Sequence, residues 1–217
     1  TTSSAASDVY KRQDTVNGVG IKYNITNFSR SMLISNDAGT GTLSSANDNT
    51  GFGHEVFDDL TSGDANTAIG KHALTKVTTG QRSVAIGYQA MDAATTGGDS
   101  VCIGYEAGSA IVSALENTFV GYYAGSLTTV AYNTAVGASS LQKNTTGTRN
   151  IAMGRLALYN NTTANDNVAI GYDSLTTNTT GASNVAIGKD ALKANTTASN
   201  NTAAVSYTHL RAHETLL

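Results

Sequence analysis

Short apolar segments recur along the chain, and each of them ends in a glycine. The segment has the form Asn/Ser–Val/Thr–Ala–Ile/Val–Gly, as at residues 167–171 and 184–188. The glycines follow one another every 17 residues, apart from one step of 16, and they are Gly53, Gly70, Gly87, Gly104, Gly121, Gly137, Gly154, Gly171 and Gly188. A constant period of this length is typical of stacked units that contact only their neighbours. We therefore expect one repetitive structure across residues 49–203.

A β-strand is the conformation that the apolar part of each repeat favours. β-Branched residues, such as Val168 and Ile170, suit the pleated backbone of a strand. Four residues before each glycine stands a small polar residue, which is asparagine at Asn49, Asn66, Asn117, Asn133, Asn150, Asn167 and Asn184 and serine at Ser83 and Ser100. Parallel stacking of the strands would align these side chains into a ladder. The sequence therefore predicts an all-β fold, a parallel β-roll or β-solenoid of about nine 17-residue coils.

The alternation of side chains along a strand predicts an inside and an outside for each coil. We expect the apolar residue directly before the glycine to face the core, at Ile69, Ile86, Ile103, Val120, Val136, Met153, Ile170 and Ile187. A second apolar residue lies four residues past most of the glycines, as at Leu74 and Leu158. We expect this residue to close the core from the other side.

The opposite face of each predicted strand carries mostly very small side chains, at Ala68, Ala85, Cys102, Phe119, Ala135, Ala152, Ala169 and Ala186. A continuous small apolar stripe on the outside of a rod is best explained as a surface that another copy of the chain covers. We therefore expect a homo-oligomer. The alternative is that these small residues pack against a second layer that the same chain forms.

Composition and charge narrow the range of partners. The 217 residues include 13 Lys and Arg against 16 Asp and Glu, a formal net charge of −3, which gives no electrostatic reason to expect nucleic acid or an anionic membrane surface. Apolar runs stay well below the roughly 18 residues of a spanning helix, so we expect no membrane insertion.

The single cysteine, Cys102, stands where most repeats have alanine, and we expect it to be a small buried hydrophobic residue.

Several repeats resemble those of a known group of fibrous proteins. NTAIGKHAL (residues 66–74), SVAIGYQAM (83–91), NVAIGYDSLTTNTTG (167–181) and NVAIGKDALKANTTA (184–198) are similar to the head repeats of YadA-like trimeric autotransporter adhesins and, more closely, to repeats of phage and viral tail-fibre proteins. The resemblance covers roughly residues 49–203. It implies a left-handed parallel β-roll, three chains side by side as a homotrimer, and an extracellular, cell-surface or virion fibre that binds a host-surface glycan or protein.

Both ends of the chain differ from the repeats. Residues 1–13 (TTSSAASDVYKRQ) and 204–217 (AVSYTHLRAHETLL) resemble translated sequencing-adapter sequence of the kind seen in metagenomic reading frames. A further copy of the motif begins at Asn201 and loses its pattern after Ala203. We therefore expect non-native flanks at 1–13 and 204–217, an N-terminal cap or degenerate first coil at 14–48, and the repeat solenoid at 49–203.

No catalytic, metal-binding or cofactor-binding site emerges from the repeats, and we expect neither an enzyme nor a bound cofactor. His54 and His72 belong to neighbouring repeats and could stack close together, but on the surface of a rod we expect both to be solvated. His209 and His213 have a spacing that suits zinc on a helix. They fall in the C-terminal flank and lack a third ligand, so we expect no metal there.

A partial row of aromatic residues is the candidate recognition surface. Tyr88, Tyr105, Tyr122 and Tyr172 share the position just after the motif glycine. Such a row suits the binding of a sugar or a protein surface. The alternative role is packing between coils or subunits.

Two other functions stand beside that of an adhesive fibre segment. A threonine column suggests an ice-binding β-solenoid, although the regular Thr-x-Thr pairs of a flat ice-matching face are missing; it comprises Thr61, Thr78, Thr95, Thr129, Thr145, Thr162, Thr179 and Thr196. A polysaccharide-degrading tail fibre is the second alternative. It would need carboxylates at a defined separation, and acidic residues do not recur in the repeat.

Overall fold

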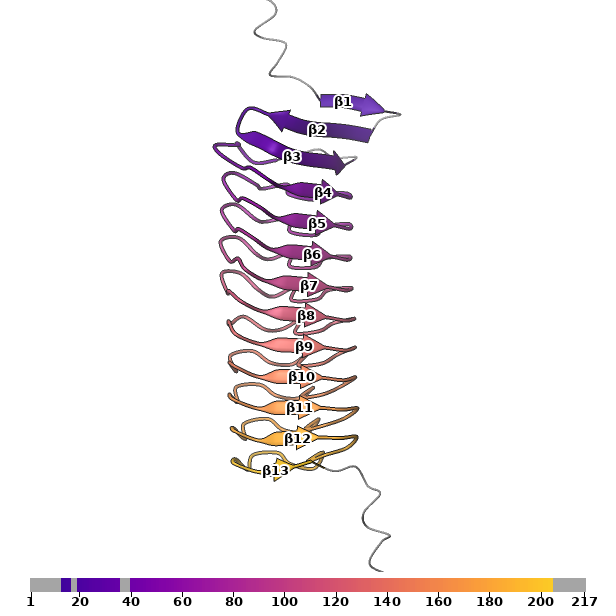
Figure 1. The fold of residues 1–217 in the computed structure, drawn as a ribbon, viewed down its shortest axis with the longest axis vertical. Coiled ribbons are helices and arrows are strands. Elements are labelled where there is room, and N and C mark those ends of the chain that lie inside the picture. Colours follow the sequence, from indigo (N-terminus) through magenta and orange to yellow (C-terminus); the bar gives the residue numbers. More distant parts are fainter. Residues whose placement is uncertain (1–12, 17–18, 36–39, 205–217) are drawn as a thin grey trace, which may run out of the picture.

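A computed structural model describes residues 13–16, 19–35 and 40–204 of the chain. These residues form one sheet of 13 strands whose spatial order is the order along the chain. The strands lie one above another in a rod (Figure 1). None of the described residues forms a helix capable of crossing a membrane. The prediction of an all-β parallel solenoid with 17-residue coils is confirmed.

The N-terminal end of the rod is antiparallel. Strands β1 (Gln13–Val16), β2 (Val19–Ile25) and β3 (Phe28–Ser35) pair as antiparallel neighbours. Strand β3 then pairs in parallel with β4 (Thr50–Phe52). The predicted cap at residues 14–48 therefore contains the strands that join the antiparallel end to the solenoid. The predicted flanks 1–13 and 204–217, with His209 and His213, lie outside the described residues apart from Gln13 and Ala204.

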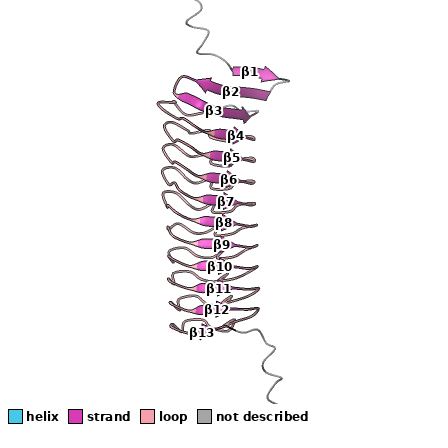
Figure 2. Cartoon of the chain, in the orientation of Figure 1, coloured by secondary structure: helices cyan, strands magenta, loops and turns pink. Residues whose placement is uncertain are grey.

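One short strand marks each coil from β4 onward (Figure 2). After β4 the strands are β5 (Thr67–Ile69), β6 (Val84–Ile86), β7 (Val101–Ile103), β8 (Thr118–Val120), β9 (Thr134–Val136), β10 (Ile151–Met153), β11 (Val168–Ile170), β12 (Val185–Ile187) and β13 (Thr202–Ala203). Equivalent residues of successive coils lie opposite each other, as Ala152 opposite Ala169. The sequence period is therefore also the register of the sheet.

The predicted faces of these strands were wrong, because the structure reverses them. The column expected on the outside is fully buried, and it comprises Ala68, Ala85, Cys102, Phe119, Ala135, Ala152, Ala169 and Ala186. The column expected in the core is partly or largely exposed, as at Ile187 with 42%. The reason is space: leucines such as Leu141 and Leu158 enter each coil from the opposite wall and are fully buried, so only a small side chain fits on the strand that faces them.

The motif glycine is required by the turn that follows each strand. Gly70 has a φ of +124° and Gly171 a φ of +132°, a region that side chains rarely adopt. A Cβ atom on Gly70 would also lie 2.6 Å from the carbonyl oxygen of Gly87 in the next coil. The positive φ and the close approach of the next coil recur along the column of motif glycines. The backbone conformation and the stacking distance therefore both require glycine at this position.

The asparagine column forms the predicted ladder. The Oδ1 atom of Asn133 accepts a hydrogen bond of 3.0 Å from the backbone N–H of Asn150, and Nδ2 of Asn150 donates to the carbonyl of Ala164 at 2.9 Å. The same pattern recurs at the other end of the rod, where Oδ1 of Asn49 accepts from the N–H of Asn66 at 2.9 Å. Because these side chains are buried and bonded on both groups, the ladder ties each coil to the next.

A second amide ladder runs through the C-terminal half, and the sequence pattern did not reveal it. Asn161, Asn178 and Asn195 each donate an Nδ2–H to the Oδ1 of the preceding member, starting from Asn144, at 3.0, 3.1 and 2.9 Å. In the N-terminal half the same position holds Leu60, Val77, Ala94, Ile111 and Thr128. This interior position therefore changes from mostly apolar residues to hydrogen-bonded asparagines along the rod.

Candidate recognition surface

The outer face of the parallel sheet is an apolar strip along the whole rod. Its main column consists of the last residue of each strand from β4 to β12 and of Ile34, which pairs with Phe52: Ile34, Phe52, Ile69, Ile86, Ile103, Val120, Val136, Met153, Ile170 and Ile187. The column beside it holds Thr, Val and Ile, as at Val84 and Ile151. We call this surface the sheet face.

An aromatic column borders the sheet face where the strands end. The rings of Tyr88 and Tyr105 stack with centroids 5.0 Å apart, and those of Tyr105 and Tyr122 with centroids 5.4 Å apart. Tyr123 packs edge-on against Tyr122 at 4.4 Å. The three predicted tyrosines thus form one continuous array, and these residues are 37–54% exposed.

The fourth predicted tyrosine, Tyr172, lies apart from this array. The intervening coils carry Ala138 and Arg155 at the same position. Arg155 donates a hydrogen bond of 2.9 Å to the hydroxyl of Tyr172 and lies 5.5 Å from its ring centroid, while Lys189 lies 5.9 Å from the same centroid on the other side. Tyr172 is therefore held between cations and does not extend the aromatic column.

One carboxylate modulates the acidity of the aromatic column. Glu106 lies 3.4 Å from the hydroxyl of Tyr123. Partial burial, followed by the negative charge of Glu106, raises the pKa of Tyr123 to about 12. A hydrogen bond to Glu106 is the main cause that raises the pKa of Tyr105. These hydroxyls therefore stay protonated, and able to donate hydrogen bonds, throughout the physiological range.

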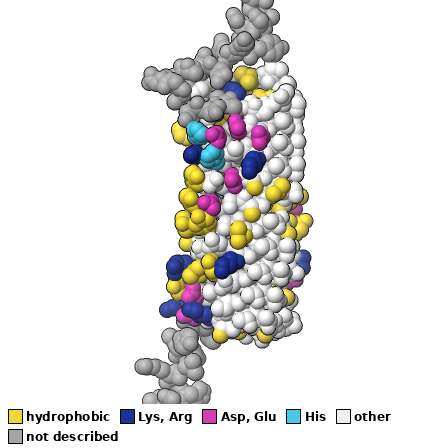
Figure 3. Space-filling model, turned by 180° about the vertical axis from the view of Figure 1, so that it is seen from behind, with side chains coloured by type: hydrophobic (Ala, Val, Ile, Leu, Met, Phe, Trp, Pro, Cys, Tyr) yellow, Lys and Arg dark blue, Asp and Glu magenta, His cyan; other side chains and the backbone are white. Residues whose placement is uncertain are grey.

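The two histidines, which we expected to be solvated, are partly exposed and share one carboxylate at the N-terminal end of the aromatic column. His54 and His72 have ring centroids 5.7 Å apart, and Tyr88 packs edge-on against His72 at 6.2 Å. The Nδ1 of His72 lies 2.7 Å from Oε2 of Glu55, and the Nδ1 of His54 lies 3.4 Å from Oε1. Figure 3 shows the histidines at the surface beside acidic side chains. The sequence analysis missed Glu55, although it stands two residues past its motif glycine, as His72 does.

Hydroxyl groups of the threonine column form hydrogen bonds between successive coils. The Oγ1 hydroxyl of Thr61 donates to the carbonyl of Thr78 at 3.0 Å, and Thr145 donates to Thr162 at the same distance. The bond recurs between Thr179 and Thr196 at 3.0 Å. These hydroxyls stabilise the stacking of coils, because each donates its proton to a carbonyl of the next coil.

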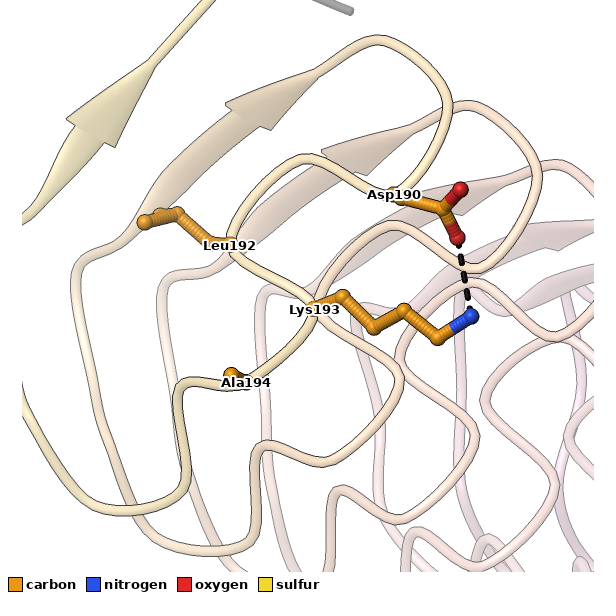
Figure 4. Close-up of a pocket in the computed structure, with 4 residues that line it drawn as sticks. All are labelled: Asp190, Leu192, Lys193 and Ala194. Atoms are coloured by element: carbon orange, nitrogen blue, oxygen red, sulfur yellow. Dashed lines mark hydrogen bonds and ion pairs between the residues drawn. The ribbon is translucent and has the colours of Figure 1, made fainter. Parts of the chain in front are cut away.

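A shallow hollow lies near the C-terminal coils, beside Leu192 and Ala194 (Figure 4). There the Nζ of Lys193 lies 2.7 Å from Oδ2 of Asp173 and 2.9 Å from Oδ1 of Asp190. The hydrogen bond to Asp173, followed by that to Asp190, raises the pKa of Lys193. Because two carboxylates from neighbouring coils share this ammonium group, we interpret the cluster as an ionic contact that stabilises the stacking of these coils.

Cys102 is buried, as the sequence predicts. Burial raises the pKa of its thiol above the ordinary value, with a hydrogen bond from the Phe119 backbone opposing this shift. A thiol of this kind forms little thiolate at neutral pH. Cys102 therefore acts as a core residue in the column of alanines.

Comparison of the chain with protein-family models, curated proteins and solved structures found no match.

Proposed function

We propose that this chain is a structural and adhesive segment of an extracellular, cell-surface or virion fibre and that it associates as a homotrimer. The observation that carries the proposal is the apolar sheet face. Parallel sheets are normally covered on both faces. In the part of the chain that the structure describes, only the inner face, which carries the alanine column, is buried. A contiguous apolar surface along a rod favours a partner of similar length.

A second copy of the chain is the partner that fits best. It presents the same apolar columns at the same coil spacing, so contacts can repeat at every coil along the rod. Three copies, as opposed to two, is the arrangement that the resemblance to adhesin and tail-fibre repeats implies. The aromatic column is then the candidate surface for a host glycan or protein, because tyrosines offer an apolar ring and a hydroxyl donor together.

Association through the sheet face is tested by the mass of the purified full chain. Light scattering is expected to give three times the 22.3 kDa of one chain. Replacing Ile86 and Ile170 together by lysine places charges in the contact and should shift the mass to that of a monomer. Val112→Lys is the matched control, since Val112 is 48% exposed and lies outside the sheet face. A stable monomer for the parent chain would contradict the trimer.

Recognition through the aromatic column is tested on a glycan array. Tyr105→Ala, in the middle of the stack, should weaken binding about tenfold if ring stacking supplies about 1.4 kcal/mol. Tyr159→Ala is the control, because Tyr159 contacts Lys143 at a different position of the repeat. Equal loss in both variants, or no binding by the parent chain, would count against this column as the receptor site.

A further inference from the structure

The cluster of His54, Glu55 and His72 has the composition of a metal site. We propose that these three side chains bind one divalent transition-metal ion, with Zn²⁺ as the best fit. Their candidate ligand atoms all lie within 4.8 Å of one another. The proposal is independent of the fibre function, because it concerns the first coils of the rod and makes no use of a receptor or a second chain.

The repeat itself brings the three ligands together. Glu55 and His72 both stand two residues past a motif glycine, so the 17-residue period places them on successive coils at equivalent positions. They share the same left-handed backbone, with φ of 52° and 59°. The N–H of His72 donates a bond of 2.9 Å to the carbonyl of His54. The backbone that carries the ligands is therefore fixed by the stacking of coils, as a preorganised metal site requires.

The candidate ligand atoms lie within the range that one metal ion can bridge. Glu55 approaches Nδ1 of His72 at 2.7 Å with one carboxylate oxygen and Nδ1 of His54 at 3.4 Å with the other. Ligand atoms around zinc lie about 2.0–2.2 Å from the metal and hence about 3.3 Å from one another.

A buried nitrogen that makes no hydrogen bond is a second observation that points to a ligand. The Nδ1 of His54 is buried, and it makes no hydrogen bond with any of the described residues. Its contact with Glu55, at 3.4 Å, is an ion-pair distance only. An unsatisfied buried polar atom costs free energy. A metal ion bound between Nδ1 of His54 and Glu55 would satisfy it.

The ligand types select the class of metal. Two imidazoles and one carboxylate suit zinc and related divalent ions, and a fourth position stays open for water. Calcium and magnesium prefer sets of oxygen ligands. Lys71 occupies the position of His54 in the next coil and adds a positive charge nearby, which lowers the affinity without changing the ligand set.

The metal would act as a clip between the first two coils of the solenoid. His54 and Glu55 follow β4, whereas His72 follows β5, so one ion would bridge both coils beside the antiparallel end of the rod. Binding to the folded state alone raises the unfolding temperature in proportion to the logarithm of metal concentration. Zn²⁺ is therefore expected to raise the melting temperature of the protein.

Metal titration of the full chain tests the proposal. His209 and His213 are first replaced by alanine, so that these residues cannot contribute, and the metal-free protein is titrated with Zn²⁺ by calorimetry. One ion per chain is expected. Glu55→Gln and His72→Asn should each weaken binding by about 100-fold or more, since loss of an outer-shell partner alone costs about 10–100-fold. Asparagine is chosen at position 72 because it tolerates the left-handed backbone there.

Glu106→Gln is the matched control, because Glu106 occupies the position of Glu55 three coils further on and lies beside Tyr123. It should bind Zn²⁺ as the parent does. X-ray absorption of the zinc-loaded parent should count two imidazole ligands, a measurement that does not depend on how the variants fold. Absence of binding, unchanged affinity in Glu55→Gln and His72→Asn, or fewer than two imidazoles would overturn the proposal.

Discussion

Two residues six positions apart share the space inside each coil. Most coils combine an alanine on the strand with a leucine on the opposite wall, as Ala135 with Leu141. The first coil instead combines Gly51 with Phe57, and a Cβ on Gly51 would lie 2.9 Å from the phenyl ring. Large and small residues thus compensate for each other within these coils.

Phe119 is the extreme case of this compensation. Its ring fills the space that leucine occupies elsewhere, and a Cβ on Gly125 would lie 2.6 Å from it. Phe119→Ala should therefore lower the free energy of unfolding by about 3–5 kcal/mol, measured by denaturant titration. Adding Gly125→Leu should recover much of this loss, because the pair then matches the common coil and leucine already adopts the same backbone at Leu141, with φ of 51°.

The single variant Gly125→Leu is the control for this exchange. With Phe119 present, the leucine has no room and should destabilise the protein. A double variant no more stable than Phe119→Ala alone would show that the two residues do not compensate for each other.

Charged pairs form a further contact between coils, at the position before the asparagine ladder. Arg82 bonds Asp99 through both carboxylate oxygens, at 2.6 and 2.7 Å. Arg149 bonds Asp166 in the same way, at 2.6 and 2.9 Å. The hydrogen bond from arginine lowers the pKa of each carboxyl from its ordinary value of 3.8. All of these groups are exposed, so their contribution is modest and screened by salt.

Acid should weaken these pairs. Because the folded pKa of each Asp lies below the unfolded value of 3.8, their stabilisation is present above that value and is lost as the pH falls through the folded pKa. We expect the melting temperature at low salt to drop across this interval below pH 4. Arg149→Gln should remove the part of this drop that comes from Asp166. An equal acid response in this variant and in the parent would contradict the assignment.

The whole molecule is modular, because each coil contacts only its neighbours. Residues 155–171 make one complete period, and equivalent residues face each other across it, as Met153 and Ile170 do. Removing this period should join Gly154 to Tyr172 and bring Asn144 next to Asn178 in the second amide ladder. The fold should persist with a rod about 4.8 Å shorter, as measured by small-angle X-ray scattering.

Removing residues 155–162 instead is the control for modularity. It breaks the period in the middle of a coil, so the glycine and asparagine columns lose their register. Circular dichroism should then show loss of β-structure. Equal tolerance of both deletions would indicate that the coils are not coupled through these columns.

The period, the strand positions and the asparagine ladder were determined by the sequence alone, since each depends only on local propensity and on a shift of 17 residues. Which face of the strand points inward was decided by the tertiary structure. Alternation along a strand is symmetric, and only the space left by Leu141 and its equivalents places Ala135 inside and Val136 outside. The contact between Glu55 and His72 was likewise decided by the tertiary structure, because these residues approach each other only when successive coils stack.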